Sequence, residues 1–293
     1  PTGFADLDYK TAGMHGSELI LVAARPAMGK SAFALNIAQN VALKAKIPVA
    51  IFSLEMSKEQ LVQRLLCAEA EVDTQKMKTG NMQAKDWEKL AGAMEKFHQC
   101  PATIYIDDTA GISVMDMRSK CRKIKMEHGI DMILIDYLQL MSGSAGSDNR
   151  QQEVSEISRS IKALAKEMEC PVIALSQLSR APEQRADHRP MLSDLRESGS
   201  IEQDADMVCF IHRPEYYHLY NDEKTGKDLR GLAQIIVAKH RNGATDSIWL
   251  RFRGKYAKFQ NEGETIDDDE MVPPIPVDTE NGMSIQSKMN SNM

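Results

Sequence analysis

A lysine and a serine that follow a glycine, Gly29-Lys30-Ser31, are the first residues along the chain that could carry chemistry. They lie between the apolar run Leu19–Val22, which predicts a buried strand, and a helical pattern over residues 31–46. A strand–loop–helix unit of this kind directs backbone N–H groups and a helix N-terminus at one point, where they bind phosphate. Lys30 is expected to reach the β- and γ-phosphates of a nucleotide, and the Ser31 hydroxyl is expected to coordinate Mg²⁺.

The loop as a whole departs from the general phosphate-binding motif at one position. The predicted phosphate-binding residues are Arg25, Pro26, Ala27, Met28, Gly29, Lys30 and Ser31. The motif G-x-x-x-x-G-K-[ST] begins with glycine, where this sequence has Ala24. Alanine is the smallest replacement and fits most turn conformations, except those that need a positive φ. The prediction of a nucleotide site therefore stands.

Three further polar residues, Glu55, Asp136 and Gln177, each end a separate apolar run. The carboxyl ends of parallel strands meet at one edge of a sheet, so these side chains are expected beside the phosphate loop. Asp136 is a candidate for the second Mg²⁺ ligand, Glu55 for the base that orients and deprotonates the attacking water, and Gln177 for a contact with the γ-phosphate. A strand-end acid on its own can instead cap a loop or be solvated; the phosphate loop upstream favours the functional interpretation.

The elements that must position these residues alternate between apolar runs and helical patterns. Predicted strands cover residues 19–22, 48–55, 103–107, 131–136, 172–177, 206–212, 232–239 and 247–253, with a short segment at 255–259. Strands that are apolar throughout and alternate with helices indicate an α/β fold with helices on both faces of a doubly wound, mostly parallel sheet. The closing strands lack predicted helices between them, so we expect an antiparallel extension at the C-terminal end of the sheet.

The charge of the chain is concentrated at its end. The 293 residues carry a net charge of −6, and from residue 261 onward there are eight acidic side chains and one lysine without any periodicity. Residues 261–293 are therefore predicted to be a disordered acidic tail, and residues 1–260 to be one nearly neutral domain. Near-neutrality of the body does not exclude a nucleic-acid partner, because a local basic strip suffices to bind one.

Cysteine usage and hydropathy indicate where the protein works. The five cysteines are widely spaced and include no C-x-x-C pair, which is typical of reduced thiols rather than of disulfides or zinc ligands. The sequence contains no apolar run of about 18 residues and no secretory signal. We therefore expect a cytoplasmic protein without membrane contact.

Six motifs resemble those of the C-terminal motor domain of DnaB-type replicative DNA helicases. They are, in order, ARPAMGKS, FSLEM, LILIDYLQL, SQLSR, DLRESGSIEQDAD and KHRNG, and the resemblance covers roughly residues 1–260. The family also has alanine at the first position of its phosphate loop. The resemblance implies a RecA-like ATPase fold and a homohexameric ring that encircles single-stranded DNA. It further implies that ATP lies between neighbouring subunits, and that hydrolysis drives 5′-to-3′ translocation and unwinding at the replication fork.

By the same resemblance, Lys30, Ser31 and Asp136 hold ATP and Mg²⁺, Glu55 is the catalytic base and Gln177 senses the γ-phosphate. Lys239 and Arg241 resemble the pair that reaches into the neighbouring subunit's site. A cation supplied from another subunit can raise the rate of phosphoryl transfer by about 10³–10⁵-fold. From the residues alone, however, Lys-x-Arg before Asn-Gly predicts the flank of a hairpin turn with two solvated charges.

The segment 194–200 resembles the loop that lines the central channel in this family. Its predicted DNA-binding residues are Arg196, Glu197 and Gly199. Arg196 is expected to neutralise a phosphate, and Gly199 to let backbone N–H groups approach the DNA closely. Contacts of this kind do not depend on base identity, as a translocating motor requires. The same composition is also typical of a flexible surface loop.

Two other functions remain open from the sequence. A RecA- or RadA-like recombination ATPase would bind ATP and DNA without processive unwinding, although RadA-type proteins carry an N-terminal Cys-rich zinc module that this sequence lacks. A ring-forming scaffold would bind nucleotide without hydrolysing it and would not need Glu55 and Asp136.

The resemblance also implies what surrounds this chain in the cell. In the family a helical collar domain and a linker helix precede the motor domain, and because this chain begins at Pro1 we expect both to be absent from it. Primase and a helicase loader are the expected protein partners. The expected location is the nucleoid, at the replication fork.

Overall fold

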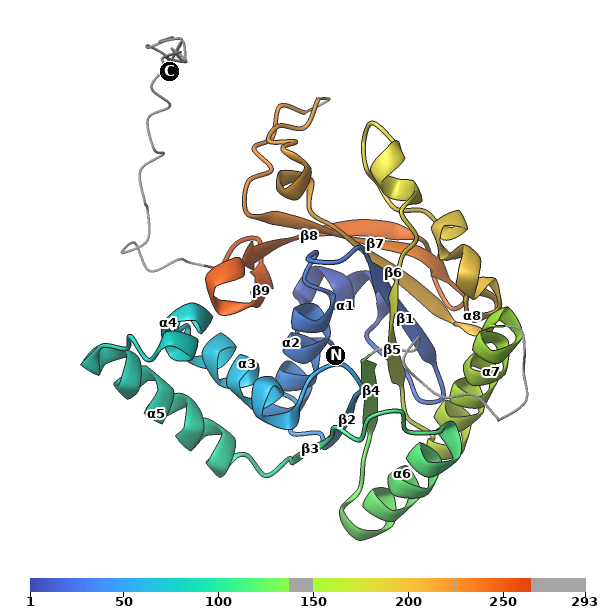
Figure 1. Cartoon of the computed structure of the whole chain (residues 1–293), viewed down its shortest axis with the longest axis horizontal. Coiled ribbons are helices and arrows are strands. Elements are labelled where there is room, and N and C mark those ends of the chain that lie inside the picture. The colour runs from blue at the N-terminus through green and yellow to red at the C-terminus, as the bar shows by residue number, and fades with distance from the viewer. Residues whose placement is uncertain (137–149, 224, 265–293) are drawn as a thin grey trace, which may run out of the picture. The chain divides into compact units, whose positions relative to one another are not determined.

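The computed structural model describes residues 1–136, 150–223 and 225–264, and for residues 150, 151 and 196–200 it describes the backbone alone. A nine-stranded sheet runs through the described residues in the order β3-β2-β4-β5-β1-β6-β7-β8-β9 (Figure 1). The strands are β1 (Leu19–Ala24), β2 (Val49–Ser53), β3 (Ile104–Asp107), β4 (Met132–Asp136), β5 (Val172–Gln177), β6 (Met207–His212), β7 (Leu232–His240), β8 (Asp246–Arg253) and β9 (Lys258–Asn261).

Strand β1 lies inside the parallel part of this sheet, and all its residues are buried. Because successive side chains of a strand point to opposite faces, Leu19 and Leu21 enter one hydrophobic cluster while Ile20 and Val22 enter another. Burial on both faces explains why the predicted strands are apolar throughout.

Helices cover the two faces of the sheet as separate layers (Figure 1). The face that receives Ile20 and Val22 is covered by α1 (Ala5–Thr11), α2 (Lys30–Leu43) and α3 (Lys58–Ala70). The opposite face is covered by α6 (Val114–His128), α7 (Arg150–Met168) and α8 (Gly199–Asp204). Two further helices, α4 (Thr74–Thr79) and α5 (Ala84–Gln99), pack beside α3. The α/β fold and its mostly parallel, doubly covered sheet are therefore confirmed.

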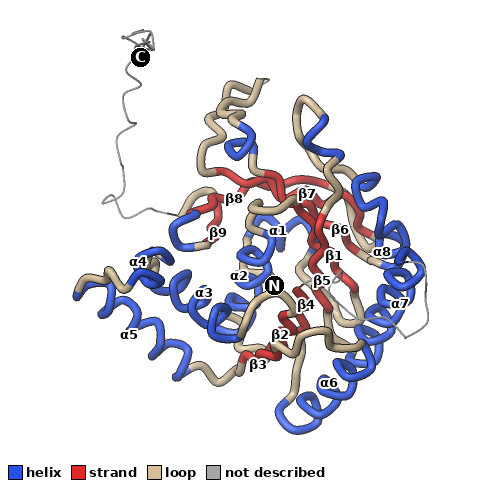
Figure 2. The backbone as a smooth tube through the Cα atoms, viewed as in Figure 1, coloured by secondary structure: helices blue, strands red, loops and turns tan. Residues whose placement is uncertain are grey.

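The antiparallel extension is also confirmed, but it begins one strand later than predicted. Strand β6 runs parallel to β1, and the antiparallel pairs are β6–β7, β7–β8 and β8–β9. These strands lie together at one end of the sheet (Figure 2). The reason is that the polar segment before β6 contains two short 3₁₀ helices, Ala181–Gln184 and Leu192–Ser198, followed by α8. These short helices carry the chain back to the start of β1, and their polar composition gave no periodic signal.

Residues Pro1–Glu262 form one compact unit. Most of the predicted acidic tail, residues 265–293, lies outside the described residues, so its disorder stays a prediction. Within the described ranges, no helix is long and apolar enough to cross a membrane.

Helix α3 begins at a capping box formed by Ser57 and Gln60. Ser57 accepts a hydrogen bond from the backbone N–H of Gln60, and the Gln60 side chain accepts one from the Ser57 N–H at 3.1 Å. Such a cap satisfies two N–H groups that the helix itself leaves without acceptors. The capping box therefore fixes the start of α3, which forms one wall of the candidate site.

Replacing Ser57 tests this cap. Ser57→Ala removes the acceptor for the Gln60 N–H and is expected to lower the free energy of unfolding by about 1 kcal/mol. Ser57→Asp keeps an acceptor at the same position and is expected to match the unsubstituted chain. Urea unfolding followed by circular dichroism measures both, and equal stability of the alanine and aspartate variants would contradict the prediction.

Candidate nucleotide-binding site

The predicted site residues converge at the carboxyl edge of the parallel strands. The last residue of β1 pairs with Gln177 in β5, and the last residue of β2 pairs with Asp136 in β4. Glu55 follows β2 by two residues and lines the same pocket as Lys30 and Gln177. The structure thus brings Lys30, Glu55, Asp136 and Gln177 together from separate elements, whereas the individual roles of these residues stay predictions.

The phosphate loop between β1 and α2 has two residues with a positive φ, Ala27 at 64° and Gly29 at 91°. Gly29 is the N-cap of α2. Because glycine has no side chain that could accept hydrogen bonds from the N–H groups of the first helical turn, these groups remain available to a bound anion. A Cβ atom at Gly29 would lie 3.1 Å from the Phe259 ring and 3.3 Å from the Phe252 ring. Glycine is therefore required here both by backbone conformation and by space.

Ala24, the departure from the general motif, needs no such freedom. It is the last residue of β1 and pairs in register with Gln177. Alanine adopts the extended conformation of a strand without strain. The strained alanine of the loop is Ala27, because a non-glycine residue in the left-handed region costs roughly 1–2 kcal/mol.

Two carboxylates compensate the buried charge of Lys30. Its Nζ atom lies 3.8 Å from Oδ1 of Asp136, and the two side chains are only 13% and 5% exposed. Burial lowers the pKa of Lys30 below its ordinary value, and the negative charges of Asp136 and Glu55 act in the opposite direction. Glu55 therefore lies within electrostatic range of the same ammonium group.

The residues at this edge fit a magnesium ion held together with a nucleotide. Oδ1 of Asp136 is buried and has no hydrogen-bond donor within the described part of the chain. A buried acceptor without a donor costs about 1–3 kcal/mol, and a carboxylate oxygen is a ligand that Mg²⁺ prefers. The described residues contain no cluster of three or more His, Cys, Asp or Glu side chains that could hold a metal ion by itself. Phosphate oxygens and water would therefore complete the coordination that Asp136 and Ser31 would provide.

The pocket has a volume of about 440 Å³ and extends well beyond the phosphate loop. Further residues, which the sequence did not indicate, line it from α3 and the turn before it, from α4, and from β8 and the turn after it: Met56, Gln60, Gln63, Arg64, Cys67, Thr74, Met77, Lys78, Phe252, Gly254 and Ala257. Those on α3 recur every three or four residues, which places them on one helix face. The same spacing occurs on solvent-exposed helix faces, so this signal alone could not have identified a pocket wall.

Two arginines fix the phosphate loop to the rest of the chain: Arg25 within the loop and Arg213 outside it. Arg25 donates to the carbonyl of Leu178 at 2.9 Å and pairs with Glu183 at 2.6 Å. Arg213, which follows β6, donates through Nη1 to the carbonyl of Ala27 at 3.1 Å.

The guanidinium of Arg213 also lies over the Phe252 ring, 4.3 Å from its centre, and Phe252 in turn packs on Phe259 with ring centres 4.6 Å apart. Burial lowers the pKa of Arg213, which is consistent with its partly buried position against the Phe252 ring. Arg213 and the two rings therefore enclose the strained part of the loop, Ala27–Gly29. The sequence alone did not indicate Arg213, because a single arginine after a strand carries no pattern.

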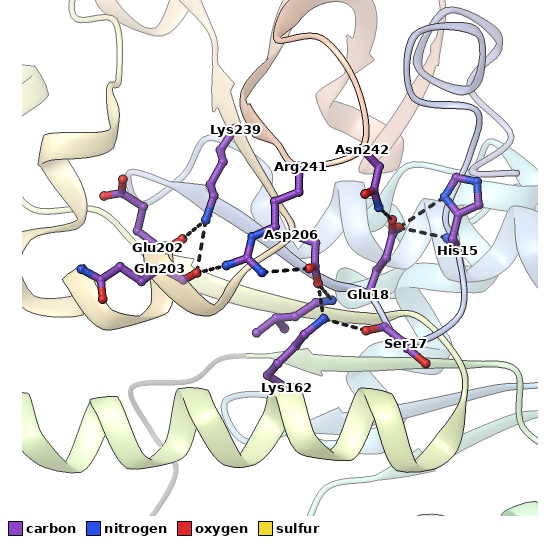
Figure 3. Close-up of polar contacts among 11 residues, drawn as sticks. His15, Ser17, Glu18, Lys162, Glu202, Gln203, Asp206, Lys239, Arg241 and Asn242 are labelled. Carbon is purple, nitrogen blue, oxygen red and sulfur yellow. Dashed lines mark hydrogen bonds and ion pairs between the residues drawn. The ribbon is translucent and has the colours of Figure 1, made fainter.

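Lys239 and Arg241 lie at the opposite edge of the sheet (Figure 3). Strand β7 runs antiparallel to β6, so that His240 pairs with Met207, which itself pairs with Ile20 near the start of β1. The phosphate loop follows the other end of β1, a six-residue strand that is roughly 20 Å long. Neither side chain can therefore reach the phosphate loop of its own chain. The predicted hairpin between β7 and β8 is present.

The predicted DNA-binding residues Arg196, Glu197 and Gly199 fall in a helical segment. Leu192–Ser198 has 3₁₀ geometry with a non-helical kink at Leu195, and α8 begins at Gly199, so the backbone is mostly helical where a loop was expected. The side chains of residues 196–200 lie outside the described part of the structure. Their contact with DNA stays a prediction.

Comparisons with known proteins agree with this geometry. The sequence model of the family described as the DnaB-like helicase C terminal domain matches residues 1–261. The replicative DNA helicase DnaB of Geobacillus stearothermophilus is 56% identical over 274 residues, which are 93% of this chain and 59% of that protein. The replicative DNA helicase DnaC of Bacillus subtilis (strain 168) is 57% identical over 275 residues, 94% of this chain and 59% of that protein. The chain thus spans less than two thirds of the length of these relatives.

Solved structures give the same result. A structure described as a DnaB-like replicative helicase and its interactions with primase superposes with a TM-score of 0.82 at 41% identity, covering 89% of this chain and 61% of that one. A second structure, described as an ATPase domain, superposes with a TM-score of 0.81 at 41% identity, covering 89% of this chain and 90% of that one.

Replacing Arg213 tests its grip on the phosphate loop. Arg213→Ala removes a charged donor from the Ala27 carbonyl, and a hydrogen bond to a charged group contributes about 1.5–3 kcal/mol. The dissociation constants of ADP and ATP are therefore expected to rise about tenfold or more, which isothermal titration calorimetry can measure. Arg230→Ala is the matched control, since Arg230 is an exposed arginine on the same connection and pairs with its near neighbour Asp228. Unchanged ADP affinity in Arg213→Ala would contradict the prediction.

Proposed function

This chain belongs to the DnaB-like helicase C-terminal domain family, and on that premise we propose that it is the ATP-hydrolysing motor of a replicative DNA helicase. The observation that carries the proposal is the separation of two sets of charged residues. Lys30, Asp136 and Glu55 gather at the carboxyl edge of the sheet, while Lys239 and Arg241 stand at the other edge. One protomer thus supplies a phosphate site, and a neighbouring protomer supplies the cations that complete it.

In this proposal each residue of the pocket has a defined task. The phosphate loop and Lys30 bind the β- and γ-phosphates of ATP, and Glu55 orients the attacking water and accepts its proton. Ser31 and Asp136 hold Mg²⁺, which when bound neutralises charge on the β- and γ-phosphates. Gln177 hydrogen-bonds the γ-phosphate and loses that partner after hydrolysis. Arg241 of the next protomer, with Lys239 beside it, stabilises the charge that develops on the γ-phosphate oxygens.

The wider assembly follows from the family. We propose a homohexameric ring that encircles single-stranded DNA and moves along it from 5′ to 3′, with the segment 194–200 against the DNA backbone. Because the chain spans 59% of its relatives in Geobacillus and Bacillus, a collar domain and a linker helix preceding residue 1 belong to the proposal. So do primase, which a structural neighbour is described as contacting, a helicase loader, and a location in the cytoplasm at the replication fork.

Subunit mixing tests whether the site is shared between protomers. Arg241→Ala is expected to lower the rate of DNA-stimulated ATP hydrolysis by about 10³–10⁵-fold, and Glu55→Gln is expected to abolish it. Rings that contain both variants include some sites with an intact Glu55 and an intact Arg241, so mixing the two inactive proteins is expected to restore part of the activity.

The control for this experiment is Arg230→Ala, which should hydrolyse ATP at the rate of the unsubstituted protein. Normal hydrolysis by Arg241→Ala, or no recovery in mixed rings, would argue against a shared site. Strand displacement on a forked duplex then separates a helicase from a recombination ATPase, which would hydrolyse ATP without unwinding the fork.

Salt dependence tests the proposed DNA contact of Arg196. Removing one phosphate contact is expected to weaken binding of single-stranded DNA equally for all sequences and to reduce the slope of log K against log salt by about 0.7. Fluorescence anisotropy with labelled oligonucleotides at several salt concentrations measures Arg196→Ala beside Arg159→Ala, an arginine on the exposed side of α7. A slope equal to that of the control would show that Arg196 does not contact a phosphate.

A further inference from the structure

Asp206 lies between three elements at the amino edge of the sheet (Figure 3). It directly precedes β6, and its side chain is 11% exposed. Oδ2 accepts hydrogen bonds from the N–H of Leu19 at 2.7 Å and from Nζ of Lys162 in α7 at 2.5 Å. Lys162 is itself fixed, because its Nζ also donates to the carbonyl of Ser17 at 2.8 Å. One oxygen of the carboxylate is thus fully engaged in holding β1, β6 and α7 together.

The other oxygen of this carboxylate faces Arg241. Nη1 of Arg241 lies 3.5 Å from Oδ1 of Asp206, and the backbone N–H of Arg241 donates to the Asp206 carbonyl at 2.8 Å. Nη2 of Arg241 donates to the carbonyl of Gln203 at the end of α8. Asp206 therefore contacts both the main chain and the side chain of Arg241.

Arg241 is nevertheless 48% exposed, so its guanidinium is held on one side and open to solvent on the other. Lys239 beside it is held differently, by the carbonyls of Glu202 at 2.5 Å and Gln203 at 3.3 Å. Burial lowers the pKa of Lys239, and the positive charge of Arg241 lowers it further, so the two cations lie close enough to repel each other. The carboxylates of Glu202, Asp206 and Asp204 oppose this repulsion at Lys239, and Asp206 also pairs with the Arg241 side chain.

Arg241 is ordered by contacts within its own chain while half of its side chain stays accessible, so it can contact a second chain without first being ordered. A free arginine side chain loses about 2 kcal/mol of rotamer entropy when it is ordered, and a misplacement of about 1 Å can lower a reaction rate by roughly 10²-fold. A buried carboxylate that fixes the guanidinium before the neighbouring site forms reduces both losses.

We propose that Asp206, anchored by Lys162 and the Leu19 amide, is the positioning residue that sets Arg241 for the neighbouring protomer's nucleotide site. The inference rests on the proposed function, in which Arg241 acts in trans. In this role Asp206 acts through Arg241 and not on the nucleotide itself.

The central test is Asp206→Asn in the full chain. Asparagine is isosteric and still accepts from the Leu19 N–H, but it removes the charge that holds Arg241. The kcat of DNA-stimulated ATP hydrolysis is expected to fall about 10–100-fold, while the KM for ATP stays the same, since the phosphate loop and its pocket lie at the other edge. A raised KM with unchanged kcat would overturn the inference.

A second variant separates positioning from stability. In Asp206→Asn alone, Lys162 loses its buried counter-charge, and breaking a buried ion pair destabilises the fold. The double variant Asp206→Asn/Lys162→Met removes both charges and is expected to regain thermal stability while hydrolysis remains slow. If hydrolysis recovers together with stability, Asp206 serves the fold only and the inference is wrong.

Subunit mixing locates the defect and separates this inference from the function on which it rests. Asp206→Asn protomers keep an intact pocket, and Glu55→Gln protomers keep an intact Arg241, so mixing them is expected to restore hydrolysis as the Arg241→Ala mixture does. Recovery with Arg241→Ala but not with Asp206→Asn would overturn the inference alone, as would normal hydrolysis by Asp206→Asn beside a slow Arg241→Ala. A fully active Arg241→Ala would instead remove the shared site itself.

Discussion

The ammonium group of Lys30 is the charge on which this structure depends. Burial disfavours the charged form of this lysine, and two acids act in the opposite direction. Oδ1 of Asp136 lies 3.8 Å from Nζ of Lys30, and Glu55 lies within electrostatic range of it. Neither acid is near Lys30 in sequence; only the order and register of β1, β5, β4 and β2 bring them together. A slip by one residue in any of these strands would turn its terminal side chain to the other face. The register of the sheet therefore determines which charges surround Lys30 in the pocket.

The late strands of the chain are part of the same construction. Phe252 and Phe259 come from β8 and β9, more than two hundred residues after the phosphate loop, and their rings pack against the position of Gly29. Arg213 is stacked on Phe252 and holds the carbonyl of Ala27. The antiparallel extension thus braces a loop whose backbone includes a strained alanine. This explains physically why residues 1–262 form one compact unit rather than a core with an appended hairpin.

The sequence could predict the features of this protein that follow from local patterns. Glu55, Asp136 and Gln177 were identified because each ends an apolar run, and parallel strands end at a common edge. The direction of β6 was predicted wrongly, because the short helices before it lie in a polar segment without periodicity. The pocket wall on α3 and α4 was missed because its side chains follow the spacing of any exposed helix face. Arg213 and Asp206 were missed for a different reason: their importance lies in single contacts across the fold, to Ala27 and Arg241, and a single contact leaves no pattern in one sequence.

Strand β7 has a consequence for how copies of this protein can associate. Because β7 runs antiparallel to β6, Arg241, which follows β7, lies at the amino edge of the parallel strands. A parallel strand in this position would have ended at the carboxyl edge instead. If Arg241 serves a neighbouring site, each protomer presents Arg241 on one surface and its own nucleotide pocket on a different surface. The interface between protomers is then heterologous rather than self-complementary. A pair related by a two-fold axis would join like surfaces and complete no site. A linear array of copies would always have one terminal pocket without an arginine from a neighbour. In a closed ring, every pocket would receive Arg241 from the next protomer.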